Sequence, residues 1–410
     1  MRDFLKQYLR LPVLPILAIM LALMWVGVRA IAAVESVDDS LAGYSSRQAV
    51  YAALALAAFF LATLIDYQRI GRWSYLAFGV NLLLLVAVLF LPAKRNCHRW
   101  IDLKLFWVQP SELAKLSYVM ALAWYLRYRS NYRQISGLIA PLLLTLIPAA
   151  LILREPDLGT SLLLLPTLFF MLLLAGAKLR HLLGTLALAV VLILLPVPQR
   201  LAGMAPAEAQ DRRALAYWSN AGGDRIVTAA ALAKMHYHQL VRIDGWLRQD
   251  DPSVIKNKGF QLYLAMVTLG GGGMTGREAG AATDECFDLL PEDQTDFIFS
   301  VIGGQWGFLG CLGVMLLYLA IFACGAWIAA RTAEPYGRLL VVGVMALLFA
   351  QIFINIGMTM GMMPITGMTL PFVSYGGSSM VVNGLALGLM VNVALRRAVF
   401  LGKKPFEFDD

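Results

Sequence analysis

Long apolar runs constrain this chain more than any other feature of its sequence. Hydrophobic residues occupy 59% of the 410 positions and charged residues only 15%. A run of about 20 apolar residues is the length that crosses a bilayer as a helix. The pattern therefore predicts an all-α polytopic membrane protein with ten transmembrane helices, over residues 11–33, 48–65, 74–92, 111–126, 137–153, 159–176, 182–197, 297–323, 337–357 and 377–395.

The first span is similar to a secretory signal, because a basic start precedes an apolar run that ends in Ala32-Ala33. Many spans follow it, so we expect a retained helix and not a cleaved leader. We expect residues 1–410 to form a single integral membrane domain, with 198–296 as one large extracytoplasmic loop between the seventh and eighth helices.

Basic residues fall mostly on one side of the predicted bundle. That side carries Arg2, Lys6, Arg10, Arg69, Arg72, Arg127, Arg129, Arg133, Lys178, Arg180, Arg331, Arg338, Arg396, Arg397, Lys403 and Lys404. Lysine and arginine are enriched in cytoplasmic loops, so both termini are predicted to be cytoplasmic. The formal net charge of +8 is then a product of topology, and it indicates no nucleic-acid binding.

One outer loop departs from this rule. Lys94, Arg95, Arg99 and Lys104 accompany a single acid, Asp102, between the third and fourth spans. The cluster is either a solvated loop that pairs with lipid phosphate, or a site for a phosphorylated, lipid-linked substrate. The second interpretation rests on the strength with which arginine and lysine bind phosphate where water is scarce.

Asp296 is the acidic residue that the sequence singles out. It is the last charged residue before Phe297 begins an apolar run, and the next charge is Arg331. A carboxylate at the rim of a bilayer is expensive and is therefore a functional candidate. Burial favours the protonated form of a carboxyl group, which makes this residue a candidate general base.

A pair of opposite charges opens the fourth span. Pro110 and Ser111 supply a helix start, and Glu112 and Lys115, three residues apart, share one face of that helix. The pair either neutralises itself and locks helix packing, or it lines an outer cavity that holds substrate phosphates or sugars.

Turn residues mark two further outer links. Asp157 can cap the helix that follows it, and we take capping as its role. The segment 361–379, rich in glycine, proline and serine, leads into the last span from the outer side. Non-helical backbone at membrane depth is tolerated only where it is buried in protein or lines a cavity.

The long segment 198–296 contains two predicted helices, 225–242 and 258–269. The second ends at the glycines 270–273, which we interpret as a turn close to other backbone. It is not a phosphate loop, because no Gly-Lys-Ser/Thr follows. His236 and His238 lack zinc-ligand spacing. Cys97 and Cys286 both fall on the outer side, where a disulfide is allowed but not favoured.

Several blocks together resemble the SEDS family, which includes RodA and FtsW. The blocks are Arg99-Trp100-Ile101, Gln109-Pro110-Ser111-Glu112 with Lys115, Pro156-Asp157-Leu158-Gly159-Thr160, Leu290-Pro291-Glu292 with Thr295-Asp296-Phe297-Ile298-Phe299, and Pro371-Phe372-Val373-Ser374-Tyr375-Gly376-Gly377-Ser378-Ser379. They run in the family's order from about residue 95 to 392. The RodA type is favoured over the FtsW type.

The resemblance implies a peptidoglycan glycosyltransferase that polymerises lipid II at the outer face of the cytoplasmic (inner) membrane. Transfer would be inverting and would release undecaprenyl diphosphate. The implied partner is a class B penicillin-binding protein, the transpeptidase, in cell elongation and shape or in division. A divalent cation, Mg²⁺ or Mn²⁺, stays open as a cofactor.

The resemblance also implies roles for particular residues. Asp296 corresponds to the family's catalytic aspartate. The residues expected to bind substrate are Arg99, Glu112, Lys115, Arg242, Gln261, Glu292, Thr295, Ser374 and Tyr375. Departures from the family pattern surround the catalytic block, at Gln294, Gly304, Gln305, Leu264 and Ala265. They leave the implied catalytic and cationic residues in place, so we interpret the chain as an active enzyme.

Two other functions stay open. A lipid II transporter (flippase) would favour charges deep in the bilayer and an inverted repeat. A non-catalytic scaffold that recruits a transpeptidase would not need Asp296. The charges here collect at one rim and the sequence shows no repeat, which favours the enzyme.

Overall fold

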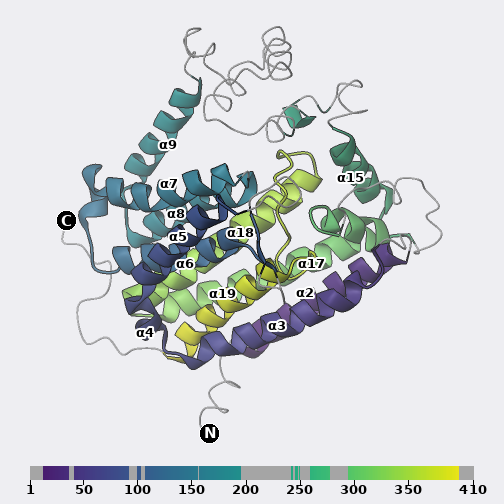
Figure 1. Cartoon of the computed structure of the whole chain (residues 1–410), viewed down its shortest axis with the longest axis horizontal. Helices are drawn as coiled ribbons and strands as arrows, with labels where there is room; N and C mark the ends of the chain where they lie inside the picture. The colour runs from purple at the N-terminus through teal and green to yellow at the C-terminus, as the bar shows by residue number, and fades with distance from the viewer. Residues whose placement is uncertain are drawn as a thin grey trace, which may run out of the picture.

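The fold of the described residues is a bundle of helices (Figure 1) with one small hairpin before α6. The computed structural model describes residues 13–36, 41–91, 99–102, 107–155, 157–194, 242, 245–247, 249, 259–277 and 294–396. The elements in chain order are α2 (Val13–Glu35), α3 (Tyr44–Leu64), α4 (Tyr67–Arg72), α5 (Ser74–Val88), β1 (Ile101–Asp102), β2 (Trp107–Val108), α6 (Pro110–Leu126), η2 (Asn131–Arg133), η3 (Ser136–Leu138), α7 (Ile139–Arg154), α8 (Leu158–Ala175), α9 (Leu179–Leu194), α15 (Phe260–Gly271), α17 (Ile298–Arg331), α18 (Pro335–Thr359) and α19 (Gly377–Leu395).

The helices match the predicted spans in place, and seven of those described are long and apolar enough to cross a membrane. These seven are α2, α3, α7 with the turn before it, α8, α17, α18 and α19. Shorter helices, α5, α6 and α9, occupy the other three predicted segments. The prediction of an all-α, multi-pass membrane protein is therefore confirmed for the described part of the chain.

Two local predictions were incomplete. The eighth span was predicted to end at 323, whereas α17 continues to Arg331, because no charged residue interrupts the apolar run before that arginine. Its 34 residues exceed the length that a bilayer needs, and Gly307, with φ 63°, breaks the helical geometry near the start. The antiparallel pair β1 and β2, with Ile101 opposite Val108, was not predicted.

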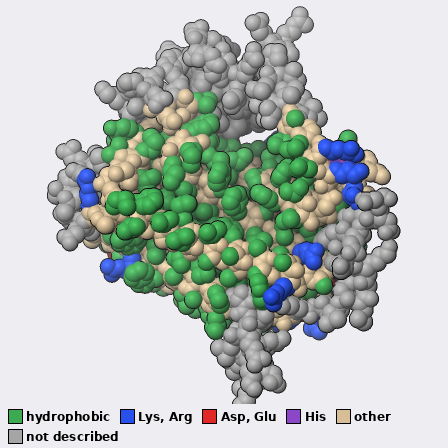
Figure 2. Space-filling view, turned by 180° about the vertical axis from the view of Figure 1, so that it is seen from behind, with side chains coloured by type: hydrophobic (Ala, Val, Ile, Leu, Met, Phe, Trp, Pro, Cys, Tyr) green, Lys and Arg blue, Asp and Glu red, His purple; other side chains and the backbone are tan. Residues whose placement is uncertain are grey.

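One broad face of the bundle is apolar. Figure 2 shows a broad face covered by hydrophobic side chains, with lysine and arginine at its margins. Exposed large side chains include Trp25, Leu83, Phe308 and Leu319. A contiguous apolar exterior of this kind is a liability in water and is typical of a surface that faces lipid.

The tightest helix packing joins α19 to α3, which lie side by side (Figure 1). An added Cβ at Gly384 would lie 2.4 Å from the carbonyl oxygen of Ala55, and one at Gly388 would lie 2.4 Å from that of Phe59. Small residues four apart let helix backbones approach closely, which is how helices associate where lipid weakens the hydrophobic drive.

The loop between α18 and α19, residues 360–376, folds back into the bundle. Its Pro371 carbonyl accepts a hydrogen bond of 2.6 Å from the Tyr318 hydroxyl in the middle of α17. A Cβ added to Gly27, in the middle of α2, would lie 2.4 Å from the Val373 carbonyl oxygen. Of the two surroundings that such backbone tolerates, buried in protein or lining a cavity, these contacts show burial between helices, and we call this segment the re-entrant loop.

The link between α7 and α8 carries a buried acid. Arg99 Nε donates to the backbone carbonyl of Glu155 at 2.7 Å and so ties the start of the hairpin to this link. The Glu155 side chain is fully buried, and neither of its oxygens has a hydrogen-bond partner. Burial, assisted by the nearby Asp157 carboxylate, raises the pKa of Glu155 to about 8 although Arg99 acts in the opposite direction.

The close α3–α19 contact should make Gly384 intolerant of a side chain. We expect Gly384→Ala to lower the unfolding temperature in detergent, with a loss of about 1–3 kcal/mol from overpacking. Gly313→Ala is the matched control, since Gly313 also lies inside a helix but an added Cβ there meets nothing within 4 Å. Equal unfolding temperatures for the two variants would contradict the packing argument.

Glu155 should make stability fall as pH rises. Its carboxyl holds a proton to about pH 8 in the folded protein but only to about pH 4.5 when unfolded, so unfolding releases a proton between these values. Glu155→Gln removes that dependence. The variant and the wild type should unfold at similar temperatures near pH 4.5, and the variant at a higher temperature near pH 8. A temperature difference that does not change with pH would overturn this assignment.

Candidate active site

Most of the residues singled out in the sequence lie at one end of the bundle, where α6, α8, α17 and α19 begin and α18 ends. The other end carries aromatic and basic side chains, including Arg127 over the Trp124 ring at 3.2 Å. Arg396 there donates to the carbonyl of Leu64 at the end of α3. The polar end is therefore distinct from the end that carries Arg127 and Arg396.

Glu112 and Lys115 form a buried ion pair. Pro110 occupies the first turn of α6, and Glu112 and Lys115 then lie one turn apart on the same face. Lys115 Nζ lies 2.9 Å from Glu112 Oε1 and 2.8 Å from Oε2. The Glu112 and Lys115 side chains are only 8% and 1% exposed, so the pair faces the interior of the bundle and not lipid.

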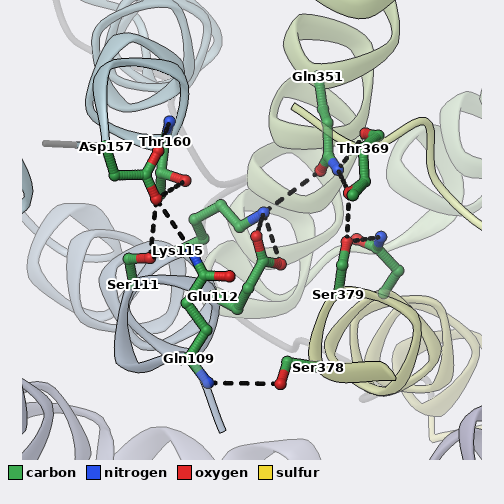
Figure 3. Close-up of polar contacts among 11 residues, drawn as sticks. Gln109, Ser111, Glu112, Lys115, Asp157, Thr160, Gln351, Thr369, Ser378 and Ser379 are labelled. Carbon is green, nitrogen blue, oxygen red and sulfur yellow. Dashed lines mark hydrogen bonds and ion pairs between the residues drawn. The ribbon is translucent and has the colours of Figure 1, made fainter. Parts of the chain in front are cut away.

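A chain of hydrogen bonds leads from this pair to the re-entrant loop (Figure 3). Lys115 Nζ donates to Gln351 Oε1 at 3.5 Å, and Gln351 Nε2 donates to the Thr369 carbonyl at 2.8 Å. The Thr369 hydroxyl lies 2.8 Å from that of Ser379, at the start of α19. The charge on α6 is thus connected through α18 to the loop and to α19.

Asp157 organises a second polar group beside the first (Figure 3). Its carboxylate accepts from the Thr160 backbone N–H at 3.1 Å and from the Ser111 hydroxyl at 3.0 Å. Gln109 Nε2 donates to the same carboxylate at 3.0 Å. The predicted helix cap is confirmed, and it also fixes the start of α6 against the start of α8.

Asp296 lies just before α17, with its side chain 7% exposed. The side-chain amide of Asn355, on α18, donates to the Asp296 carbonyl at 3.1 Å and to the Met368 carbonyl. A Cβ added to Gly367 would lie 3.0 Å from Arg242 Nη1 and 3.4 Å from Asp296 Oδ2. The structure therefore brings the predicted catalytic acid and a predicted cation to the same side of one glycine.

The re-entrant loop also meets the long segment between α9 and α17. Trp246 Nε1 donates to the Gly361 carbonyl at 2.9 Å. A Cβ added to Gly361 would lie 2.8 Å from both Gln249 Oε1 and Met266 Sδ. Both glycines in these contacts, Gly361 and Gly367, have positive φ angles (74° and 72°), so side chains there would be strained as well as crowded.

The departures from the family pattern are packed and not exposed. Leu264 and Ala265, on α15, form a small apolar cluster with Phe297, the residue after Asp296. The glycine turn that follows α15 packs against α17, where a Cβ on Gly272 would lie 1.9 Å from the Gly303 carbonyl and 3.0 Å from the Gly304 Cα. The turn was predicted to approach other backbone closely, and this is confirmed.

The other predicted substrate-binding residues have different surroundings. Gln261 is partly buried in the first turn of α15, and Thr295 precedes Asp296 directly. The Ser374 hydroxyl accepts from the Leu370 N–H at 2.7 Å and so belongs to the loop's own turn. The Tyr375 ring lies 4.7 Å from that of Tyr44, and the backbone N–H of Tyr375 donates to the backbone carbonyl of Gln294. Glu292, Cys97 and Cys286 lie outside the described residues.

Three residues of this site were not predicted from the sequence. They are Gln351 and Asn355, 1% and 0% exposed, and Gly367. The sequence does contain a signal for Gln351 and Asn355, because these two amides are four residues apart and so share one face of an apolar span. Polar side chains are costly there and mark a functional or structural contact. Among the described residues, no three His, Cys, Asp or Glu side chains are grouped in a way that could hold a metal ion.

Comparisons with known proteins agree with this arrangement. A model of the FtsW, RodA and SpoVE family, described as "Cell cycle protein", matches residues 8–398. The chain is 32% identical over 361 residues to "Probable peptidoglycan glycosyltransferase FtsW" of Geobacter metallireducens, covering 86% of this chain and 85% of that protein. It is 30% identical over 423 residues to "Peptidoglycan glycosyltransferase RodA" of Treponema pallidum, covering 93% and 97%.

A solved structure is similar over nearly the whole length. The fold matches a chain from "Structural coordination of polymerization and crosslinking by a peptidoglycan synthase complex" with a TM-score of 0.72 and 28% identity, covering 93% of this chain and 97% of that one. The sequence blocks, the helical bundle and the matched length agree, and the chain belongs to the FtsW, RodA and SpoVE family.

Proposed function

We propose that this protein is a peptidoglycan glycosyltransferase that polymerises lipid II. The observation that carries the proposal is the meeting of Asp296 and Arg242 beside Gly367, at the polar end of a membrane bundle. A carboxylate beside a cation suits a reaction in which one group removes a proton and another steadies an anionic leaving group. The names of its relatives support the same activity.

In the proposed reaction, Asp296 takes the proton from the 4-hydroxyl of the acceptor sugar. That oxygen attacks the anomeric carbon of the donor, and the bond to undecaprenyl diphosphate breaks. A single displacement converts an α-linked donor into a β-linked product. Arg242 is the cation placed to steady the departing diphosphate, with Arg99 at the same rim. Lys115 Nζ is paired with the Glu112 carboxylate, so we assign that pair to positioning within the substrate cavity.

The proposed membrane arrangement rests on the uneven distribution of basic residues between the two ends of the bundle. We propose ten transmembrane helices in one integral domain over residues 1–410, with both termini cytoplasmic and 198–296 as the large outer loop. Many of the described basic residues, such as Arg127, Arg331 and Arg396, lie at the end of the bundle opposite Asp296, which supports an active site that faces outward from the cytoplasmic membrane. Glu292, Gln261, Thr295, Ser374 and Tyr375 complete the proposed substrate-binding set.

We propose a class B penicillin-binding protein, a transpeptidase, as the partner. The support is the likeness to a chain of a peptidoglycan synthase complex, whose description joins polymerisation to crosslinking. The comparisons include both RodA and FtsW proteins, and we favour the RodA type, acting in elongation.

Asp296→Asn should abolish polymerisation of labelled lipid II by the purified protein, because an amide cannot accept the proton; general bases contribute about 10²–10⁴-fold. Asp296→Ala should behave alike, with normal expression. Asp66→Asn is the matched control, since Asp66 caps α4 at the other end of the bundle and asparagine caps equally well. Wild-type activity in Asp296→Asn would reject the general-base role. Lipid II translocation without polymerisation by the wild type would favour a transporter.

The Glu112–Lys115 pair can be tested for function apart from packing. Lys115→Ala should cost about 3–5 kcal/mol of stability, because it leaves a buried charge unpaired. The double variant Glu112→Gln with Lys115→Met removes both charges and should recover much of the unfolding temperature but not polymerisation. If the double variant recovered activity as well, the pair would serve helix packing only and would have no role in the reaction. Lys115→Arg should retain little activity, since the planar guanidinium of arginine does not replace the compact ammonium of lysine.

A further inference from the structure

Asn355 makes a contact that the proposed reaction does not use directly. It lies on α18 and is fully buried, and its one side-chain nitrogen donates to two backbone carbonyls from different parts of the chain. One carbonyl belongs to Asp296 and the other to Met368, the residue after Gly367. A primary amide has two N–H groups on one planar nitrogen, so it is suited to hold two acceptors at a fixed separation.

The two carbonyls that Asn355 holds belong to the two sides of the proposed site. Asp296 supplies the carboxylate, and Gly367 supplies the open face against which both Asp296 Oδ2 and Arg242 Nη1 lie. A shift of either backbone would change where the carboxylate lies relative to the guanidinium. Displacement by about 1 Å at a catalytic group can lower a rate by about 100-fold.

A second amide extends this contact along α18. Gln351 lies four residues before Asn355, on the same face, and donates to the Thr369 carbonyl at 2.8 Å while accepting from Lys115. Residues 368 and 369 are thus both held from one helix. One face of α18 therefore contacts Asp296 and the re-entrant loop through Asn355, and the loop and the buried ion pair through Gln351.

We propose that Asn355 is a positioning residue for Asp296, and that it acts by holding the Asp296 and Met368 carbonyls together. The inference rests on the proposed function. Asn355 is not a catalytic residue, since it touches backbone and not the reacting groups. Its contribution is to keep the carboxylate of Asp296 beside Arg242 at Gly367, so that the base and the cation act on one bound substrate.

The chain contains a matched control for this contact. Asn392, on α19, is also fully buried and also donates to two backbone carbonyls, those of Ala62 and Ile65. These carbonyls lie at the end of α3, at the opposite end of the bundle from Asp296. Substitution of Asn392 therefore removes a contact of the same kind but leaves the site alone, and it also removes the hydrogen bonds that Asn392 Oδ1 accepts from the Tyr67 N–H and the Arg396 guanidinium.

The test compares Asn355→Asp and Asn355→Ala with Asn392→Asp and Asn392→Ala in the full chain, with its transpeptidase partner where the wild type needs it. Unfolding temperature and the kinetics of lipid II polymerisation are measured for each protein. Aspartate keeps the shape of asparagine but has at most one donor, and that only when it is protonated, so it cannot hold both carbonyls. We expect the Asn355 variants to lose about 100-fold in kcat per folded protein, with KM within about threefold of wild type.

A pH profile separates positioning from damage to the fold. If Asn355→Ala lets the carboxylate move away from Arg242, that carboxylate holds its proton more tightly, and the acidic limb of the kcat profile moves to higher pH. A loss of folded protein would lower kcat by the same factor at every pH. Neither Asn392 variant should move the acidic limb, although both should lower the unfolding temperature.

Each outcome has a distinct meaning. Wild-type kcat in folded Asn355→Ala and Asn355→Asp would overturn the positioning role, as would equal kinetic losses and unshifted pH profiles in the Asn355 and Asn392 variants. If neither Asn355 variant folds, a kcat loss with a shifted acidic limb in Gly367→Ala supports the same geometry, and a wild-type profile there rejects it. An inactive wild type, or an active Asp296→Ala, would instead overturn the proposed function itself.

Discussion

The re-entrant loop depends on polar side chains that reach it from apolar helices. Backbone carbonyls buried at membrane depth have no water to bond, and an unsatisfied one costs several kcal/mol. Four side chains on three helices supply the donors: Gln48 on α3 to the Ser374 carbonyl, Tyr318 on α17 to Pro371, and Gln351 and Asn355 on α18 to Thr369 and Met368. Polar side chains are unusual in apolar spans, and these four are accounted for by the loop carbonyls that they bond.

This constraint also fixes the neighbouring helices. Because the loop enters between α2, α3, α17 and α18, each of them must leave room for backbone, as Gly27 does against Val373. Phe372 adopts a φ of 65°, a conformation that costs a non-glycine residue energy and persists only where the surroundings hold it. The fully buried Phe372 and Val373 side chains anchor the turn in the core of the bundle. The loop is therefore rigid by packing, and it can serve as a reference surface for the site.

Sequence reasoning recovered what depends on local pattern. Span positions follow from apolar runs, the Asp157 cap from the residues beside it, and the Glu112–Lys115 pair from their spacing on one helix face. The meeting of Asp296 with Gly367 could not be predicted in the same way, because it joins segments 71 residues apart through the path of a loop. The two-residue strands were missed because so short a pairing leaves no periodic signal.

Residues that depart from the family pattern illustrate the same limit. In the sequence alone, Leu264 and Ala265 are apolar residues near the catalytic block, at positions that depart from the family pattern. In the structure they pack against Phe297, so the wall next to Asp296 is apolar and closely filled. The Gly272 contact with Gly303 and Gly304 likewise needs glycine only because α15 and α17 come close together. The roles of these residues are set by contacts with residues distant in sequence.

The re-entrant loop is also the surface that the bundle shares with the long segment. On the bundle side it is held by Gln351 and Asn355, and on the other side it touches Arg242, Trp246 and Gln249. Asp296 ends the long segment in sequence but takes its backbone position from α18. The proposed base and the proposed cation thus reach Gly367 from different supports: Asn355 on α18 holds the backbone of Asp296, and Arg242 comes from the long segment. The geometry of the site therefore depends on how that segment packs against the re-entrant loop, which it does through Trp246 and Gln249.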